Sequence, residues 1–171
     1  KVSFMRCLFV SNMFPPFGRG GYEQWCDEVA TALALRGHAV AVLTSRAPES
    51  ATNGVSSLQT ADAERGFAVY RSLYPEVEGG LAQTTMRLLR SRARFETENV
   101  RLTGALIADY RPDVVLIWGM WNIARTVSQE IERLLGQRVA YYFCDYWPSL
   151  PNAYIQRMQE PARRQSFQTM K

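Results

Sequence analysis

Short apolar runs alternate along the chain with longer segments in which apolar residues recur at helical spacing. Runs rich in aliphatic and aromatic residues, each bounded by polar or turn-forming residues, predict buried strands. They lie at residues 7–12, 38–44, 67–73, 113–118 and 138–143. Helical spacing predicts helices over residues 21–36, 81–110 and 123–135, and the proline-containing tail contains a short helix.

The first predicted helix has the clearest boundaries. Trp25, Val29 and Leu35 are among its periodic apolar positions, acidic residues fill its first turns, and Gly37 supplies a C-terminal cap. In the long predicted helix, Arg111-Pro112 marks the end. Residues 45–65 are polar and without periodicity, which is typical of a mobile or functional connection.

The order of these elements predicts a mostly parallel sheet with helices on both faces. We therefore expect a Rossmann-like three-layer α/β sandwich. The length of 171 residues fits a single domain over residues 1–171.

Composition excludes several classes of protein. Hydrophobic residues make up 47% and charged residues 21% of the chain, which is typical of a globular domain. No apolar run approaches the roughly 20 residues of a membrane-spanning helix, and no secretory signal is recognisable. The three cysteines are too widely spaced for a disulfide framework or a zinc site. We expect a cytoplasmic protein that needs no metal ion.

The basic residues narrow the chemistry further. Lysine occurs only at Lys1 and Lys171, which excludes a phosphate-binding loop lysine and a buried Schiff-base lysine. The single histidine, His38, begins a predicted strand, about 20 Å from that strand's carboxyl end at roughly 3.3 Å per residue. Nucleophile–histidine catalysis at that end is therefore not expected. The net charge of +4 favours anionic partners, but no nucleic-acid-binding motif is present.

In open parallel sheets, ligands bind beyond the carboxyl ends of the strands. Residues 12–23, 44–46, 118–122 and 144–147 should converge there. The segment FGRGGYE lies between the first strand and the first helix, where glycines let backbone N–H groups approach a phosphate. A dinucleotide fingerprint does not fit, because Glu23 stands in place of its third glycine and Thr44 and Ser45 replace its acid. A tight turn without a ligand is the alternative interpretation.

The segment CDYWP after the last predicted strand offers a thiol, a carboxylate, a phenol and an indole. Aromatic rings beside one acid suit sugar stacking and hydroxyl recognition. The alternative is that Asp145 caps the next turn while the aromatic residues seal the edge of the core.

Several segments together resemble a known family. The segment LFVSNMFPPFGRGGYEQWCDEVATALALRGHAVAVLTS is similar to the opening pattern of the retaining glycosyltransferases of family 4, and FAVYRSLYP, PDVVLIWG and VAYYFCDYWP follow at the expected places. The resemblance covers residues 6–160 and implies the amino-terminal half of a GT-B fold. It also implies that the second, nucleotide-binding half is absent from this chain, so that this half alone would be inactive.

The resemblance also implies site residues. In the family the Gly-Gly turn lies against the donor diphosphate and the acceptor, and loops after the later strands shape the acceptor and sugar pocket. The residues expected to bind substrate are Gly20, Gly21, Glu23, Arg71, Tyr74, Trp118, Gly119, Asn122, Tyr146 and Trp147, and those expected to take part in catalysis are Cys144 and Asp145. Cys144 is a departure, because many members carry histidine at this position. Such enzymes typically need neither a metal ion nor another cofactor.

The expected function is therefore that of the acceptor-side domain of a glycosyltransferase. It would transfer a sugar, with retention, from a nucleotide-sugar donor to a saccharide, lipid or other hydroxyl acceptor. One alternative is a noncatalytic Rossmann-like module that binds a phosphorylated small molecule. Another is a non-hydrolysing sugar-nucleotide epimerase, which a single acid and a distant histidine make less suitable.

Arginines gather on one face of the long predicted helix, at Arg87, Arg90, Arg94 and Arg101. The face opposite to these arginines carries the apolar positions of the helix. Such a basic face predicts either a solvated surface or peripheral contact with anionic lipid at the inner face of a membrane.

Overall fold

A computed structural model describes residues 3–18, 20–46, 60–62 and 65–159 of the chain. The strands are β1 (Arg6–Ser11), β2 (Ala39–Ser45), β3 (Thr60–Asp62), β4 (Phe67–Leu73), β5 (Val114–Trp118) and β6 (Val139–Tyr142). The helices are α1 (Gly21–Leu35), α3 (Leu81–Arg90), α4 (Arg92–Tyr110), α5 (Thr126–Leu135), the short 3₁₀ helix η1 (Gly136–Arg138) and α6 (Ala153–Gln159).

The strands form one sheet in the order β3-β4-β2-β1-β5-β6. The five strands from β4 to β6 in this order are parallel, which confirms the predicted α/β class. β3 is a correction, since no strand was expected within residues 45–65, and it pairs antiparallel with β4. Its three residues are too few to show a periodic pattern. The rest of that polar connection, residues 47–59 and 63–64, lies outside the described part.

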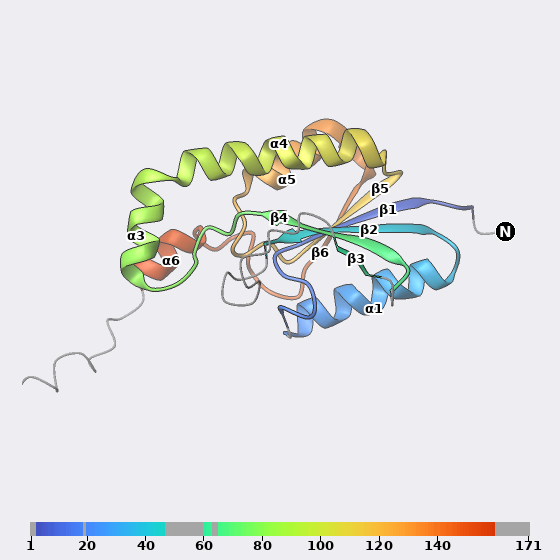
Figure 1. The fold of residues 1–171 in the computed structure, drawn as a ribbon, viewed down its shortest axis with the longest axis horizontal. Helices are drawn as coiled ribbons and strands as arrows, with labels where there is room; N and C mark the ends of the chain where they lie inside the picture. Colours follow the sequence, from blue (N-terminus) through green and yellow to red (C-terminus); the bar gives the residue numbers. More distant parts are fainter. Residues whose placement is uncertain (1–2, 19, 47–59, 63–64, 160–171) are drawn as a thin grey trace, which may run out of the picture.

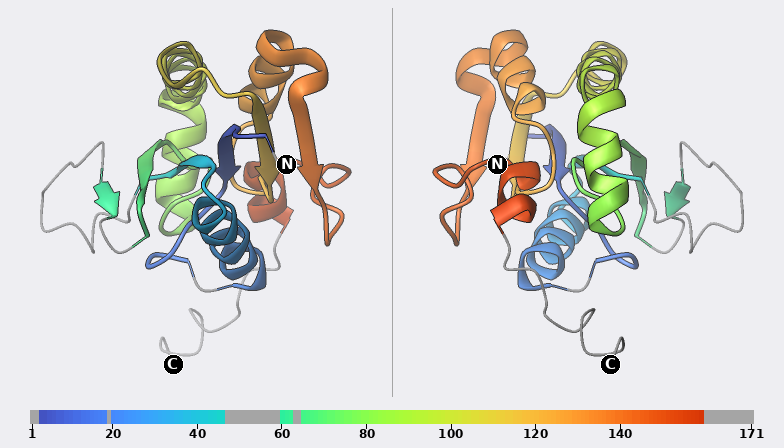
Figure 2. Two further views of the ribbon diagram at one scale, coloured as in Figure 1. Left: turned by 90° about the vertical axis from the view of Figure 1, so that its right-hand side faces the viewer. Right: turned by 90° about the vertical axis from the view of Figure 1, so that its left-hand side faces the viewer.

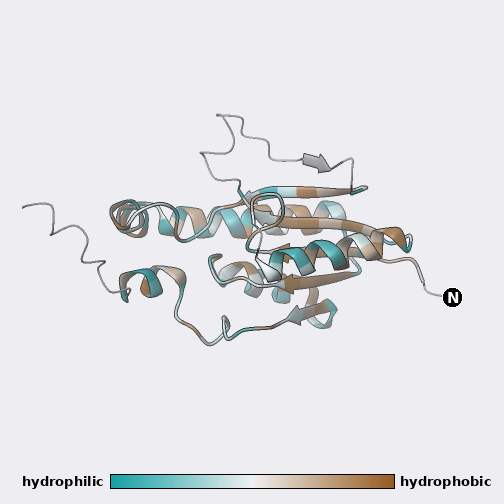
Figure 3. Ribbon diagram, turned by 90° about the horizontal axis from the view of Figure 1, so that it is seen from below, coloured by the Kyte–Doolittle hydropathy of each residue, from teal (hydrophilic) through white to brown (hydrophobic). Residues whose placement is uncertain are grey.

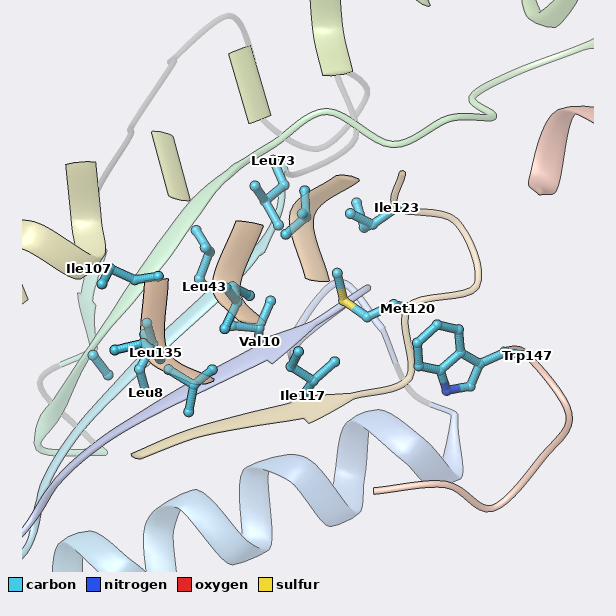
Figure 4. Packing of buried hydrophobic residues seen from close by; sticks show 14 residues of the cluster. Leu8, Val10, Leu43, Leu73, Ile107, Ile117, Met120, Ile123, Leu135 and Trp147 are labelled. Carbon is cyan, nitrogen blue, oxygen red and sulfur yellow. The ribbon is translucent and has the colours of Figure 1, made fainter. Parts of the chain in front are cut away.

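Helices cover both faces of the sheet, as expected for a Rossmann-like three-layer sandwich. α1 lies on one face and α4 and α5 lie on the other (Figures 1 and 2). The parallel strands are among the most hydrophobic segments (Figure 3), because a parallel strand is buried on both sides. The core on the α4–α5 face contains the residues drawn in Figure 4, including Leu8, Ile117 and Met120.

The helix expected over residues 81–110 is broken at Ser91. This residue has φ −126° and both ends α3 and begins α4. The break turns α3 away from the sheet and onto α6, which it contacts. The break accompanies this contact between distant segments, and the amino-acid pattern around Ser91 contains neither glycine nor proline to mark it.

The buried face of α1 also differs from the prediction. Cys26 and Ala30 are fully buried, whereas Trp25, Val29 and Leu35 are 52%, 37% and 84% exposed. Small side chains let the helix approach the sheet closely, so the larger apolar residues lie on the outer side. Periodicity identified the helix and also Leu33, another of the periodic positions, which packs against the core, but Trp25, Val29 and Leu35 lie on the outer side.

At the amino end of the sheet, Gly37 and His38 have structural roles. Gly37 follows the C-cap residue Arg36 and has φ +87°. A residue with a side chain adopts this conformation only with strain, so Gly37 confirms the predicted end of α1. The neighbouring His38 is 8% exposed, and its Nδ1 accepts a hydrogen bond from the Met5 N–H at 3.2 Å. His38 therefore lies at the end opposite to the candidate site, as the sequence predicted.

Candidate functional site

Backbone hydrogen bonds tie the carboxyl ends of neighbouring strands together. The N–H of Asn12 donates to the carbonyl of Gly119 at 2.9 Å, and the N–H of Ser45 donates to the carbonyl of Asn12 at 3.3 Å. The N–H of Cys144 donates to the hydroxyl of Tyr22 at 2.6 Å. The four segments that the sequence predicted to converge thus lie at one edge of the sheet.

The amino terminus of α1 forms one wall of this edge. Gly20 is its N-cap in an extended conformation, and no side chain caps the first turn. The first N–H groups of a helix have no partner within the helix and carry partial positive charge. A Cβ atom built on Gly21 would meet nothing within 4 Å, so the first turn borders open space. Helix termini of this kind are common anion-binding positions in proteins.

Glu23 has a structural position beneath the glycine turn. The residue is 8% exposed, and a Cβ atom on Gly20 would collide with Glu23 Oε2. A Cβ atom on Gly18 would lie 2.7 Å from the Cβ of Met13 and 2.9 Å from the Cγ of Glu23. Gly18 and Gly20 therefore make room for the protein's own side chains, and Gly21 alone borders open space.

A row of polar and aromatic side chains crosses the sheet beneath α1. Arg71, Thr44, Ser11, Trp118 and Tyr142 are register partners on five neighbouring strands. The Thr44 hydroxyl and the Trp118 Nε1 are buried and have no hydrogen-bond partner in the described part of the chain. Such groups are uncommon, because desolvating them costs about 1–3 kcal/mol each.

Asn12, directly after β1, is a further buried polar residue that the sequence did not single out. Its side chain is 1% exposed, and neither of its amide atoms has a partner among the described residues. Its position as a polar residue directly after the first strand was the sequence signal that could have marked Asn12 as a candidate site residue. With Trp147, whose Nε1 is also buried without a partner, four described side chains in the converging segments have unpaired polar atoms, and such atoms call for a ligand, an ordered water or another explanation.

Arg71 turns inward and fastens the loop before the glycine turn. Its guanidinium donates to the carbonyl oxygens of Phe14 and Pro15 and lies 4.9 Å from the centre of the Phe17 ring. The side chain is 8% exposed. Arg71 therefore holds the segment Phe14–Phe17 that leads to Gly18, and its expected contact with substrate stays a prediction.

Two asparagine side chains brace the loop that follows β4. Asn99 accepts from the N–H of Tyr74 at 2.7 Å and donates to its carbonyl at 2.9 Å. Asn122 bonds the N–H and carbonyl of Val77 in the same way at 2.8 and 2.9 Å. The amide of Asn122 is thus engaged within the protein. The centre of the Tyr74 ring lies 3.8 Å from the Arg46 guanidinium carbon and 4.4 Å from the centre of the Phe95 ring, on which it stacks.

Tyr22 links three segments of the edge and was missed in the sequence. Its hydroxyl accepts from Cys144, and its ring lies under Gly119, where a Cβ atom would approach it to 3.1 Å. Gly119 has φ +49°, so glycine is favoured there for two reasons. Burial raises the pKa of Tyr22 above its ordinary value, so the hydroxyl stays protonated near neutral pH. The only signal was an aromatic residue in the first turn after Gly20-Gly21.

The residues after β6 divide into two groups. Tyr146 is 81% exposed, and Cys144 and Asp145 are also exposed. Asp145 Oδ1 accepts from the N–H of Trp147 at 2.9 Å, as in the capping alternative. Trp147 is 6% exposed and lies beside Met120 in the core (Figure 4). Its expected place at the rim is therefore corrected, because the ring seals the edge of the core.

Trp118 is likewise covered by protein. It is 4% exposed and stacks on the ring of Tyr142 at 4.0 Å. Within the described residues, no group of three or more His, Cys, Asp or Glu side chains is arranged to hold a metal ion. No helix in the described part is long and apolar enough to cross a membrane.

Fold and site together define the chain as a Rossmann-like α/β domain with an open helix terminus at the carboxyl edge of its sheet. Comparison with known proteins adds no closer assignment. No protein-family model matches the sequence, and no curated protein matches it at a significant level.

Glu76, in the braced loop, gives the domain a testable pH dependence. It is 5% exposed and accepts from the Ala153 N–H of α6 at 2.8 Å. Burial raises its pKa above the ordinary value of 4.5, with smaller opposing effects from Ala153 and Arg92. The folded state thus binds this proton more tightly than the unfolded state. The resulting stabilisation is complete below pH 4.5 and is lost as the pH rises through the raised pKa.

We expect Glu76→Gln to remove this loss, because the amide stays neutral and still accepts from Ala153. Urea unfolding of both proteins across the acidic range should show the stability of Glu76→Gln rising relative to the parent as the pH increases. Glu28→Gln, at an exposed position of α1, is the control. A stability difference between parent and Glu76→Gln that is constant with pH would contradict the assignment.

Proposed function

We propose that this chain is the acceptor-side domain of a retaining glycosyltransferase that uses a nucleotide-sugar donor. The observation that carries the proposal is the uncapped amino terminus of α1, which borders open space at Gly21. Backbone N–H groups in this position bind a diphosphate through charge-assisted hydrogen bonds, each worth about 1.5–3 kcal/mol. The resemblance of the glycine turn and of the segment after β6 to family 4 supports the same assignment.

The arrangement of the edge is consistent with transfer that needs no nucleophilic side chain. His38 lies at the other end of the sheet, and Asp145 caps its own turn. In the proposed mechanism, the acceptor hydroxyl oxygen bonds to the anomeric carbon of the donor sugar on the face from which the diphosphate leaves. The bond from that carbon to the diphosphate oxygen breaks, and the hydroxyl proton passes to the departing oxygen, whose charge the helix terminus stabilises. Exposed Tyr146 would offer a ring for sugar stacking. Cys144 and Asp145 would line the sugar side of the pocket, and the donor nucleotide would be held by a second domain.

The alternative is a noncatalytic module that binds a phosphorylated small molecule at the same helix terminus. It is favoured by the internal engagement of Arg71 and Asn122, which leaves few side chains for chemistry. Both functions use the Gly20-Gly21 turn. They differ in whether a sugar is transferred.

Titration of the isotope-labelled chain with inorganic diphosphate and with nucleotide sugars tests the proposal. We expect the amide signals of Gly20, Gly21 and Tyr22 to shift in a saturable way, because their N–H groups face the anion. Amides at the amino end of the sheet, such as that of Ala39, should not shift. No shift at the glycine turn would refute both functions. Shifts without sugar transfer, measured together with a nucleotide-binding half, would favour the noncatalytic module.

A further inference from the structure

Helix α3 exposes apolar side chains to solvent. Leu81, Met86 and Leu89 are 56%, 49% and 76% exposed, whereas Thr84 is buried. The helix contacts α4 and α6 and lies beyond the carboxyl ends of the strands (Figure 1). A surface helix normally turns its apolar side chains toward the core. Here three large ones remain outside.

The neighbouring helix α6 also exposes apolar side chains. Ile155 and Met158 are 45% and 48% exposed, and α6 contacts α3. Single exposed apolar residues are ordinary, but several on adjacent elements indicate a surface that meets another phase or molecule.

The charged residues of α3 itself are all basic, and the acidic residues Glu78, Glu96 and Glu98 on the adjoining segments form ion pairs with Arg87, Arg92 and Arg101. Arg90 ends α3 and Arg94 lies in the first turn of α4, and both are exposed. The ten residues of α3 include no acidic residue. Arg87 and Arg101, by contrast, form ion pairs with Glu78 and Glu98. The arginine face predicted from the sequence is thus reduced to Arg90 and Arg94, which form no ion pair with a described residue.

We propose that this α3 face, defined by Leu81, Met86, Leu89, Arg90 and Arg94, docks on the surface of an anionic lipid membrane. Apolar side chains enter the boundary between headgroups and acyl chains, while arginines attract the anionic headgroups. Weak apolar insertion and weak electrostatic attraction add to give measurable peripheral binding. Arg90 and Arg94, together with the absence of acidic residues from α3, provide charge complementarity to an anionic surface. The proposal is independent of the proposed transferase function.

Co-sedimentation of the chain with lipid vesicles tests this. We expect binding to vesicles of phosphatidylcholine mixed with phosphatidylglycerol, weaker binding at high salt, and little binding to phosphatidylcholine alone. The double substitution Leu89→Glu with Arg90→Glu should lower the partition coefficient between vesicles and water at least about tenfold. Arg90→Glu reverses a positive charge, and Leu89→Glu places a carboxylate where an apolar side chain would enter the bilayer.

The chain contains a matched control for this variant. Leu35 and Arg36 repeat the same leucine–arginine pair at the end of α1, where Leu35 is 84% exposed, and α1 ends at the opposite side of the molecule (Figure 1). Leu35→Glu with Arg36→Glu should retain at least about half of the binding, because only charge far from the bilayer has changed. Circular dichroism confirms folding of both variants, and Arg90→Glu alone serves if Leu89→Glu does not fold.

Three results would overturn the proposal. The parent chain could remain in the supernatant with anionic vesicles at low salt. The α3 variant could bind as well as the parent. The α1 variant could lose as much binding as the α3 variant, which would show that net charge alone drives association.

Discussion

Replacing Gly21 with tryptophan is expected to abolish diphosphate binding while leaving the fold intact. The indole would occupy the open space beside the first turn of α1 and cover the N–H groups that the anion needs. Loss of even one charge-assisted hydrogen bond of about 1.5–3 kcal/mol lowers affinity roughly tenfold or more. Isothermal titration with inorganic diphosphate measures this loss. In a polypeptide that joins this domain to a nucleotide-binding half, sugar transfer should be lost as well.

Gly80→Trp is the matched control, because Gly80 is the N-cap of α3 and a Cβ atom there also meets nothing within 4 Å. Urea unfolding should show both variants within about 1 kcal/mol of the parent, since neither glycine has a positive φ. Unchanged diphosphate affinity in Gly21→Trp would rule out this turn as the binding site. An equal loss in Gly80→Trp would place binding elsewhere or show a general effect.

Arg71→Ala is expected to cause the largest loss of stability, about 3–4 kcal/mol. The guanidinium donates to two carbonyl oxygens of the Phe14–Pro15 segment, and its removal leaves these acceptors without that donor. The contact with the Phe17 ring is lost as well. Urea unfolding measures the change, and diphosphate affinity should fall with it, because the loop leads directly into the glycine turn.

Two other substitutions give this prediction its controls. Arg71→Lys should recover part of the stability, since an ammonium group can bond one carbonyl but lacks the fork of the guanidinium. Arg101→Ala should leave stability unchanged, because its ion pair with Glu98 is on the surface. Parental stability in Arg71→Ala would contradict a structural role and return Arg71 to the residues available for substrate.

The glycine turn shows how far the sequence could define the candidate site. Its place between β1 and α1 follows from the order of apolar runs and from the breaker-rich segment between them. The amino-acid pattern alone cannot separate the roles of Gly18, Gly20 and Gly21. Only the packing of Glu23 and Met13 distinguishes Gly18 and Gly20, which are required by neighbouring side chains, from Gly21, which borders open space.

The aromatic residues near the same edge make the same point. Tyr146 and Trp147 are adjacent and both were expected at the rim, yet one is 81% and the other 6% exposed. Local pattern cannot separate them, because outside a helix or strand no regular periodicity fixes the direction of a side chain. The contact of Trp147 with the core that holds Met120 decided the difference.

The sequence by itself determined the α/β class, five of the six strands, and the convergence of four loops at one edge. These depend on apolar runs, helical spacing and turn residues, which are local properties of the chain. The tertiary structure decided which face of α1 is buried, where the long helix breaks, and that Arg71, Asn122 and Tyr22 hold loops together. The reason is physical: burial and hydrogen bonding depend on partners far away in the chain, such as Tyr22 and Cys144, and local periodicity contains no information about them.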